Sequence, residues 1–347
     1  MIKIGLSLRP AASCGGLMVD MDFANHTIIG LDIGGTKTAV VEGSAQSEIL
    51  QREELATEAS RPFDETFPRI AALIKKTIEA ARRSSREALA ISVSIGGPLK
   101  IAEGVLIDPP HLPGWRGVRL KERLAAEFPN LPVFVEHDGN AGALAEFHFG
   151  VGRGRDDLRH LVFLTFGTGL GAGLIVNGQV LRGATDTAGE VGHLRLAWEG
   201  PIGFGKAGSW EGFASGEGLV ALASRMFPGR WSRETPIREV VEAALTDDPL
   251  ALEVAAEAGK WMGRGMALLV DTLNPQIIAL GSLAVALGDR VLAPARRALA
   301  EEALPQAVAA CEVVPAKLGK RIGDVAALIA ALTENNNVGE GFPRRRP

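Results

Sequence analysis

Apolar and polar positions along residues 27–147 form short blocks that predict alternating strands and helices. Short apolar runs, several of them rich in β-branched residues, predict strands at residues 28–32, 38–42, 90–95 and 133–136. Apolar residues spaced three or four positions apart predict helices at residues 70–81, 120–128 and 141–147. This alternation is typical of an α/β fold built around a sheet.

The first two strands are joined by a short glycine-containing turn. Residues 33–37 read IGGTK, and the segment after them is short and β-branched, which favours strand–turn–strand over strand–turn–helix. The second half of the chain opens in the same way, with a strand at 160–164, a glycine turn at 167–171 and a returning strand at 172–176. Two such units predict a duplicated architecture with a cleft between its halves.

The rest of the second half is mostly helical. Helical spacing predicts helices at residues 215–227, 237–245 and 252–273. They are followed by a strand at 276–281, a helix from about residue 283, a strand at 312–315 and a last helix at 325–332. Residues 1–26 show no convincing period and are expected to be a disordered extension.

The composition excludes several classes of protein. Because 37 Lys and Arg residues face 41 Asp and Glu residues, for a net charge of −4, a nucleic-acid-binding surface is not expected. Two cysteines, Cys14 and Cys311, make no disulfide framework and favour a reducing compartment, so we expect a cytoplasmic protein. No apolar run reaches the ~18 residues that cross a bilayer, and no membrane partner is expected.

The glycines fit one nucleotide-binding pattern better than two others. A P-loop requires Lys where this chain has Thr36, and no helix follows the first turn. A Rossmann fingerprint occurs at residues 203–208, but without the apolar strand that must precede it. A glycine turn between strands exposes backbone N–H groups that can cradle phosphate oxygens. Two such turns, one with Asp32 and one with Thr168, indicate a phosphate-binding cleft.

Motifs spread over residues 28–332 together resemble the ROK family of sugar kinases, part of the actin–hexokinase–heat-shock ATPase superfamily. They read DIGGTK at 32–37, LPGW at 112–115, EHDGNA at 136–141, FGTGLGAG at 166–173, AGEVGH at 188–193, NPQIIALG at 274–281 and VPAKLG at 314–319. Each motif is weak alone, whereas their occurrence in family order is specific. The resemblance implies a two-lobed, actin-like or ribonuclease-H-like α/β ATPase fold with a cleft between the lobes.

The resemblance also implies a division of the chain and roles for matching residues. The smaller α/β lobe would hold residues 27–136 and 322–334, the larger α/β lobe residues 137–321, and residues 335–347 would be a flexible tail.

Asp138 would be the general base that takes the proton of the attacking sugar hydroxyl. Asp32 would bind Mg²⁺ indirectly, near the phosphates. The residues expected to bind ATP and its phosphates are Asp32, Gly34, Gly35, Thr36, Gly167, Thr168, Gly169 and Gly281. Those expected to contact the sugar are Gly97, His137, Asp138, Glu190, His193 and Glu211.

Some of these residues also have purely structural interpretations. Asp138 precedes a predicted helix and could be its N-cap. Asp32 could be an ordinary turn residue, and Gly281 part of a plain strand-to-helix turn. A lone histidine such as His193 is more often structural than functional. The motifs around these residues favour the functional interpretations.

One departure from the family pattern concerns a metal. The family usually carries a CxCGxxGCxE zinc loop, and its three cysteine positions hold Ile202, Phe204 and Ser209 in this chain. Without thiolates a tetrahedral Cys₃His site cannot form, so no structural zinc is expected. Apolar packing of Ile202, Phe204 and Trp210 is expected to hold the loop instead.

A second departure lies on the sugar side. His137 stands where the family usually has Asn, and an imidazole is bulkier than an amide and titrates near neutrality. Residues 96–98 read GGP rather than the more usual GxPGP form. Both changes fall where sugar specificity would be set, which weakens any substrate assignment taken from glucokinase-like members.

The sequence therefore predicts an ATP-dependent hexose kinase that uses Mg²⁺, with glucose converted to its 6-phosphate as the default reaction. Fructose, mannose or an N-acetylated amino sugar are alternative substrates. A sugar-responsive transcription regulator is an alternative of another class, although residues 1–26 are too few for the DNA-binding domain that such regulators add. An inactive sugar-binding protein is a third, against which Asp32 and Asp138 argue. By family habit, a homodimer is expected.

Overall fold

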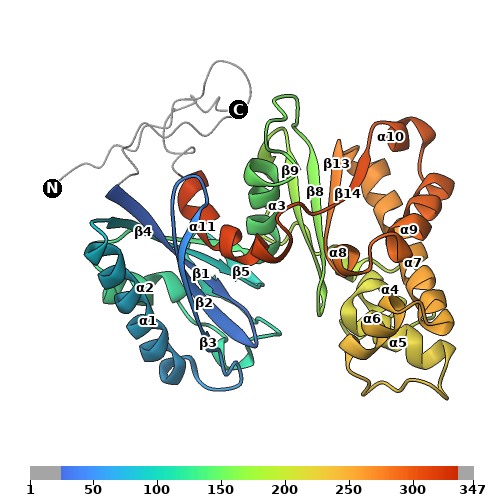
Figure 1. The fold of residues 1–347 in the computed structure, drawn as a ribbon, viewed down its shortest axis with the longest axis horizontal. Coiled ribbons are helices and arrows are strands. Elements are labelled where there is room, and N and C mark those ends of the chain that lie inside the picture. The colour runs from blue at the N-terminus through green and yellow to red at the C-terminus, as the bar shows by residue number, and fades with distance from the viewer. Residues whose placement is uncertain (1–24, 335–347) are drawn as a thin grey trace. The chain divides into compact units, whose positions relative to one another are not determined.

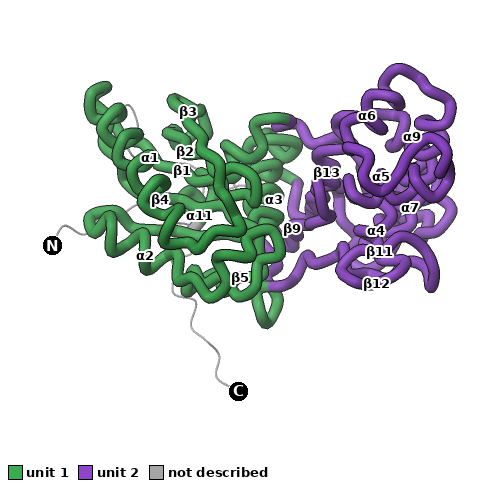
Figure 2. Tube along the Cα trace, turned by 90° about the horizontal axis from the view of Figure 1, so that it is seen from below, with its two compact units in different colours: residues 1–157, 183–186, 320–347 green, residues 158–182, 187–319 purple. Residues whose placement is uncertain are grey.

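The computed structural model describes residues 25–334 and divides them into two compact units (Figures 1 and 2). Within the described range, the first unit comprises residues 25–157, 183–186 and 320–334, and the second comprises residues 158–182 and 187–319. The expected extension and tail fall on residues 1–24 and 335–347, outside the described residues. His26, which was assigned to the extension, is the first residue of a strand.

The first unit is built on a five-stranded sheet in the order β3-β2-β1-β4-β7. Its strands are β1 (His26–Ile33), β2 (Lys37–Gly43), β3 (Ile49–Ala56), β4 (Glu87–Ile95) and β7 (Val133–His137). A small hairpin is made by β5 (Leu99–Lys100) and β6 (Val105–Leu106). Because β1 pairs antiparallel with β2, the predicted strand–turn–strand is confirmed, and β4 and β7 continue the sheet parallel to β1.

Helices cover both faces of this sheet (Figure 1). They are α1 (Phe63–Arg83), α2 (Leu120–Glu127), α3 (Asp138–Phe149) and α11 (Ile322–Glu334), with a short 3₁₀ turn at η2 (Pro113–Trp115). Successive residues of a strand face opposite sides of the sheet, so Ile29 and Leu31 together join the apolar core under α1 and α2. Gly30 instead faces α11, where an added Cβ would lie 2.9 Å from Leu328.

The division between the units differs from the expected boundary at residue 136. The structure groups α3 and the residues after it, up to residue 157, with the first unit. The physical reason is that α3 packs against α11, as well as against β7 and β4. The chain therefore passes to the second unit after α3 rather than before it.

The second unit repeats the topology of the first, with a five-stranded sheet in the order β10-β9-β8-β13-β14. Its strands are β8 (Leu161–Phe166), β9 (Leu170–Val176), β10 (Gln179–Val180), β13 (Ile277–Ser282) and β14 (Glu312–Pro315). Again an antiparallel pair, β8 with β9, is followed by two parallel neighbours. The duplicated architecture predicted from the two glycine turns is confirmed within the described residues.

The helices of the second unit gather over its sheet (Figure 1). They are α4 (Trp210–Ala214), α5 (Gly216–Met226), α6 (Ile237–Leu245), α7 (Pro249–Leu273), α8 (Leu283–Leu287), α9 (Asp289–Glu302) and α10 (Pro305–Ala309). A hairpin of β11 (Ile202–Gly203) and β12 (Lys206–Ala207) and a 3₁₀ turn, η3 (Val191–His193), precede α4. Glycines bring α7 close to α9, because a Cβ on Gly263 would lie 2.2 Å from the carbonyl oxygen of Ala295.

The apolar pattern missed one strand of the first sheet. β3 lies at the sheet edge and carries Gln51, Arg52, Glu53 and Glu54, so it has no apolar run. Charged edge strands of this kind are common because they discourage pairing with other chains. Among the described helices, none combines the length and hydropathy that crossing a membrane would require.

Candidate functional site

The predicted carboxylates of the first unit lie at one edge of its sheet. β1, β4 and β7 are parallel, and their register aligns Asp32 with Ser94 and Ser94 with Glu136. Parallel strands end at the same edge, so the residues after them come together. Asp32 at the end of β1, Gly97 after β4 and Asp138 after β7 therefore share this edge. A Cβ added to Gly96 would lie 3.5 Å from Oδ2 of Asp138.

Asp138 is not the N-cap of the helix that it begins. The N-cap of α3 is His137, whose Nδ1 accepts a hydrogen bond from the backbone N–H of Gly139 at 3.3 Å. Oδ1 of Asp138 also accepts from Gly139, at 2.7 Å, while its side chain remains 53% exposed. The capping interpretation thus applies to His137, and Asp138 presents its carboxylate at the strand edge.

The ring of His137 is oriented by this cap and by Asp138, whose Oδ1 lies 3.5 Å from the same Nδ1. Nε2 lies at the other edge of the ring. Gly97 faces the same ring edge, since an added Cβ there would lie 3.0 Å from Nε2 and 2.7 Å from Cδ2. Gly97 is therefore required for the close approach of the imidazole, a reason that the sequence pattern did not supply.

A buried pair that sequence reasoning missed fixes the junction between β7 and α3. Oε1 of Glu136 accepts from the backbone N–H of His137 and from Nδ2 of Asn140, both at 3.0 Å. Both Glu136 and Asn140 are almost fully buried. This pair holds the backbone on either side of Asp138, and the only sequence signal for it was its place in the EHDGNA motif.

The carboxyl group of Asp32 is unusually basic. Burial, and then the nearby charges of Asp138 and Asp324, raise the pKa of Asp32 from 3.8 to about 6. Asp324 belongs to α11 and accepts a hydrogen bond from Arg52 at 2.9 Å. The start of α11 approaches Asp32 through Gly323, where a Cβ would lie 2.4 Å from Oδ2 of Asp32. The negative charges of these three carboxylates therefore act on one another at this edge of the sheet.

The first glycine turn is fixed by hydrogen bonds around the expected phosphate-binding residues. Gly34 donates to the carbonyl oxygen of Lys37 at 3.0 Å, and its own carbonyl oxygen accepts from the hydroxyl of Thr57 at 2.7 Å. The carbonyl oxygen of Thr36 accepts from the backbone of Thr57 at 3.1 Å. A side chain at Gly35 would collide with His111, 2.5 Å from its carbonyl oxygen. These hydrogen bonds fix the conformation of the turn, and the absence of a side chain at Gly35 lets the turn approach the backbone of His111.

The second glycine turn rests on the start of α5. The carbonyl oxygen of Gly167 accepts from the backbone N–H of Gly216 at 2.7 Å, and that of Thr168 from Glu217 at 3.3 Å. The ends of β8 and β13 are adjacent, because Phe166 pairs with Ser282. A pocket of about 680 Å³ opens beside them. Gly167 and Thr168 line it, whereas Gly169 and Gly281 are not among its lining residues.

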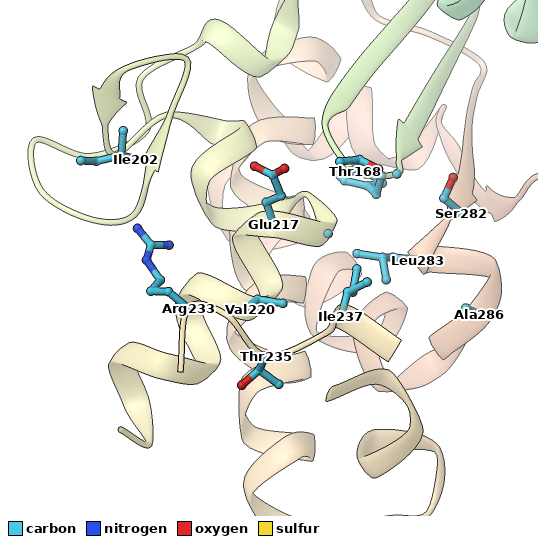
Figure 3. Close-up of a pocket in the computed structure, with 13 residues that line it drawn as sticks. Thr168, Ile202, Glu217, Val220, Arg233, Thr235, Ile237, Ser282, Leu283 and Ala286 are labelled. Atoms are coloured by element: carbon cyan, nitrogen blue, oxygen red, sulfur yellow. The ribbon is translucent and has the colours of Figure 1, made fainter. Parts of the chain in front are cut away.

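Most of this pocket was not foreseen from the sequence (Figure 3). Its apolar part is formed by Val220, Ile237 and Leu283, which lie close together in Figure 3. Its polar part adds Glu217 from α5 and Arg233 from the loop before α6. An apolar wall beside a glycine turn suits a ligand with a flat base and a phosphate chain.

The expected sugar-contacting residues of the second unit lie on neighbouring elements. Glu190 precedes η3 and His193 ends it, while Glu211 is in α4, which contacts η3. Oε2 of Glu211 accepts from the backbone N–H of Leu170 at 2.9 Å. Gly192 lies beside both residues, since a Cβ there would lie 2.7 Å from the carbonyl oxygen of Leu170 and 3.4 Å from Cβ of Glu211. The structure thus brings these three side chains to one region of the unit.

The loop expected to rely on apolar packing is held differently. Ile202 is 61% exposed, so the expectation that it packs the loop was wrong, whereas Trp210 is buried. Ser209 instead donates to the carbonyl oxygen of Gly203 at 3.1 Å and accepts from the backbone N–H of Gly212 at 3.2 Å. A hydroxyl used in this way and an exposed isoleucine do not make a zinc site. Among the described residues, no group of three or more His, Cys, Asp or Glu could hold a metal ion.

We therefore predict that protein purified without chelators contains no stoichiometric zinc. Elemental analysis measures this directly, and treatment with EDTA should leave the thermal midpoint unchanged, because no thiolate set is present to bind the ion. One zinc per chain, lost on chelation with a fall in midpoint, would contradict the prediction.

Known proteins are similar to this chain over most of its length. The sequence model of the ROK family matches residues 28–334. A glucokinase of Streptomyces coelicolor is 32% identical over 321 residues, which is 86% of this chain and 95% of that protein. A xylose repressor of Caldicellulosiruptor bescii is 28% identical over 294 residues, covering 82% of this chain and 72% of that protein.

Solved structures share the fold. A ROK family glucokinase from Streptomyces griseus, in complex with glucose and AMPPNP, superposes with a TM-score of 0.72 at 29% identity. The match covers 88% of this chain and 99% of that one. The expected α/β fold of actin-like ATPases is confirmed.

Proposed function

The chain belongs to the ROK family, and we propose that it transfers the γ-phosphoryl group of ATP to a hydroxyl of a hexose, with glucose, phosphorylated at its 6-hydroxyl, as the default substrate. One observation carries the proposal. Asp138 presents a half-exposed carboxylate at the sheet edge that also holds Asp32. The N-cap of α3 is His137, so Asp138 is not needed to cap this helix. The glucokinase relatives of similar length support the same class of reaction.

Asp138 is the proposed general base. Its carboxylate takes the proton of the sugar hydroxyl as that oxygen forms a bond to the γ-phosphorus, and the bond to the β–γ bridging oxygen breaks to release ADP. The hydrogen bond from Gly139 to Oδ1 orients the carboxylate. Glu136 and Asn140 hold the backbone beneath it, so the side chain is positioned before the sugar binds.

The pocket beside the second glycine turn is the proposed ATP site. Its apolar wall of Val220, Ile237 and Leu283 would take the adenine, and the backbone N–H groups around Gly167 and Thr168 would contact phosphates. In the first unit, Gly34, Gly35 and Thr36 supply a second turn of the same kind. Gly169 and Gly281 do not line this pocket, and their contact with the nucleotide phosphates stays part of the proposal.

In the first unit, Asp32 is the residue that would bind Mg²⁺, indirectly through water. Its negative charge is disfavoured by burial and then by the charges of Asp138 and Asp324, and a divalent cation nearby would offset both effects. When bound, the ion neutralises charge on the phosphate oxygens. The role of Asp32 is to ionise beside the phosphates and hold the ion there through water.

The sugar would be bound by Gly97, His137, Glu190, His193 and Glu211, in addition to Asp138. Carboxylates and imidazoles bind neighbouring hydroxyls in pairs. At His137 an imidazole nitrogen edge faces the sugar side, whereas the shorter amide of the usual Asn offers a donor and an acceptor side by side. This difference makes His137 the first residue to test for the choice between glucose and fructose, mannose or an N-acetylated amino sugar.

We predict that glucose gives the highest ADP release in a panel of hexoses and N-acetylated amino sugars. In the same panel, His137→Asn should change the ratio of kcat/KM between sugars by about fivefold, the equivalent of one hydrogen bond of about 1 kcal/mol. If no sugar stimulates ADP release, the kinase proposal fails. An unchanged ranking in His137→Asn would remove only His137 from sugar selection.

A sugar-responsive regulator remains the second candidate, because a xylose repressor aligns with 82% of the chain. Sugar-stimulated turnover of ATP distinguishes the two classes, since a regulator needs sugar binding alone. We further propose a cytoplasmic homodimer that binds neither nucleic acid nor membrane.

A further inference from the structure

The hairpin of β11 and β12 contains a strained residue. Ile202 pairs with Ala207 and Gly203 with Lys206, so Phe204 and Gly205 form a two-residue turn. Both have positive φ angles, +52° for Phe204 and +66° for Gly205. Turns of this type favour Asn, Asp or Gly at the first position, because a bulky side chain with positive φ is strained. Phe204 therefore occupies its turn against local preference.

Burial of its ring does not explain the choice of Phe204, since 39% of the residue is exposed. The ring instead stacks on the imidazole of His193, with 3.7 Å between centroids and 21° between planes. Gly192 makes room for it, because a Cβ there would lie 3.0 Å from Cε2 of Phe204. The strained backbone at Phe204 thus occurs together with a specific contact between its ring and His193, a proposed sugar-binding residue.

The same hairpin holds His193 at a second point. Nζ of Lys206 donates to the carbonyl oxygen of His193 at 2.8 Å. The hairpin itself is anchored by Ser209, which bonds to Gly203 and caps α4 through Gly212. Phe204 and Ser209 stand at two of the positions where the zinc loop of the family has cysteines. The contacts that fix this loop are therefore a ring stack, an ammonium–carbonyl bond and a cap.

We propose that Phe204 is a positioning residue for sugar binding: its ring fixes the plane of the His193 imidazole, in the place of a metal ion that this loop has no ligands to hold. Hydrogen bonds of an imidazole lie in the plane of its ring. Covering one face therefore fixes the directions of both nitrogens while leaving the ring edge for a ligand. This inference rests on the proposed role of His193 in sugar binding.

The substitution Phe204→Asn separates this role from a structural one. Asn tolerates positive φ, so the hairpin should form at least as readily while the ring is lost. We expect KM for the sugar to rise about threefold to tenfold, the usual range for an aromatic pair. KM for ATP and the thermal midpoint should not worsen, and Phe204→Tyr, which retains the ring, should restore the sugar KM.

A matched control removes another exposed aromatic side chain from the same stretch of chain. Trp198 is 86% exposed, and Trp198→Asn should leave KM for the sugar unchanged. If Phe204→Asn keeps the wild-type sugar KM, or raises both KM values equally, the positioning role is wrong. An unstable Phe204→Asn protein would likewise show that the ring serves the fold.

The stack has a readout that does not need catalysis. A phenyl ring over an imidazole at this distance shifts the His193 ring protons upfield in NMR spectra, with the signal assigned by its loss in His193→Gln. Phe204→Asn should abolish the shift in the absence of sugar, and persistence of the shift would refute the stack. If the wild-type protein shows the shift but phosphorylates no sugar, the proposed function fails while the stack stands.

Discussion

Asp138→Asn is expected to lower kcat by about 10²- to 10⁴-fold, the usual contribution of a general base. The amide has the shape of the carboxylate, and its Oδ1 can keep the hydrogen bond from Gly139. It cannot take a proton from the sugar hydroxyl. Because Asn can still hydrogen-bond the sugar hydroxyl but cannot take its proton, KM for both substrates should change far less than kcat.

The fold should tolerate this substitution. His137 caps α3, so the cap does not depend on Asp138. The charge of Asp138 raises the pKa of Asp32, and its removal lowers that pKa toward the ordinary value and relieves repulsion. The thermal midpoint at neutral pH should therefore be equal or higher.

Steady-state ADP release at saturating ATP and sugar measures the loss of kcat. Asp289→Asn serves as the control, since Asp289 is a surface carboxylate whose side chain is 83% exposed and pairs with Arg296 in the second unit. Turnover of Asp138→Asn at the wild-type rate would place the base elsewhere.

The elements with a strong apolar pattern were predictable from the sequence, and the site residues on them followed. Asp32 was placed at the end of a predicted strand and Asp138 before a predicted helix, and the structure shows that both lie where parallel strands end. Their roles stay predictions. The strand β3 could not be predicted, because it lies at the sheet edge, where Arg52 and its charged neighbours are tolerated and leave no apolar run to recognise.

Most of the features that could not be predicted from the sequence depend on contacts between distant segments of the chain. Gly323 and Asp324 lie beside Asp32 because α11 crosses the sheet, and no local pattern encodes that. The pocket residues Glu217 and Arg233 come from a helix start and a loop that carry no recognised motif. The capping role of His137 depends on the position of its ring relative to the backbone N–H of Gly139, which only the folded geometry defines.

Asp32→Asn should have opposite effects on stability and on turnover. The folded-state pKa of Asp32 is about 6, above its ordinary value of 3.8. Below 3.8 the group is protonated whether the chain is folded or not, and it does not alter the free energy of unfolding. As pH rises from 3.8 to 6, the unfolded chain ionises first, so Asp32 destabilises the folded protein increasingly, and above pH 6 this effect is constant.

Removing the charge should therefore stabilise the protein at pH 7.5 by about 3 kcal/mol, since each unit of pKa corresponds to roughly 1.4 kcal/mol. Urea unfolding without Mg²⁺ at pH 7.5 and again near pH 4 measures this, and the gain should nearly vanish at the lower pH. Asp289→Asn, with its exposed carboxylate, should show no comparable gain.

Turnover should move the other way. If Asp32 holds Mg²⁺ beside the phosphates, its amide variant loses charge stabilisation worth several kcal/mol, and kcat/KM for ATP should fall on the order of a hundredfold. Mg²⁺ should raise the thermal midpoint of the wild-type protein more than that of Asp32→Asn, because the cation offsets the cost of burying the negative charge of Asp32 beside Asp138 and Asp324. A variant that is less stable at pH 7.5 would mean that the carboxylate supports the fold. A variant that is stabilised yet fully active would mean that the buried negative charge of Asp32 serves no step of phosphoryl transfer.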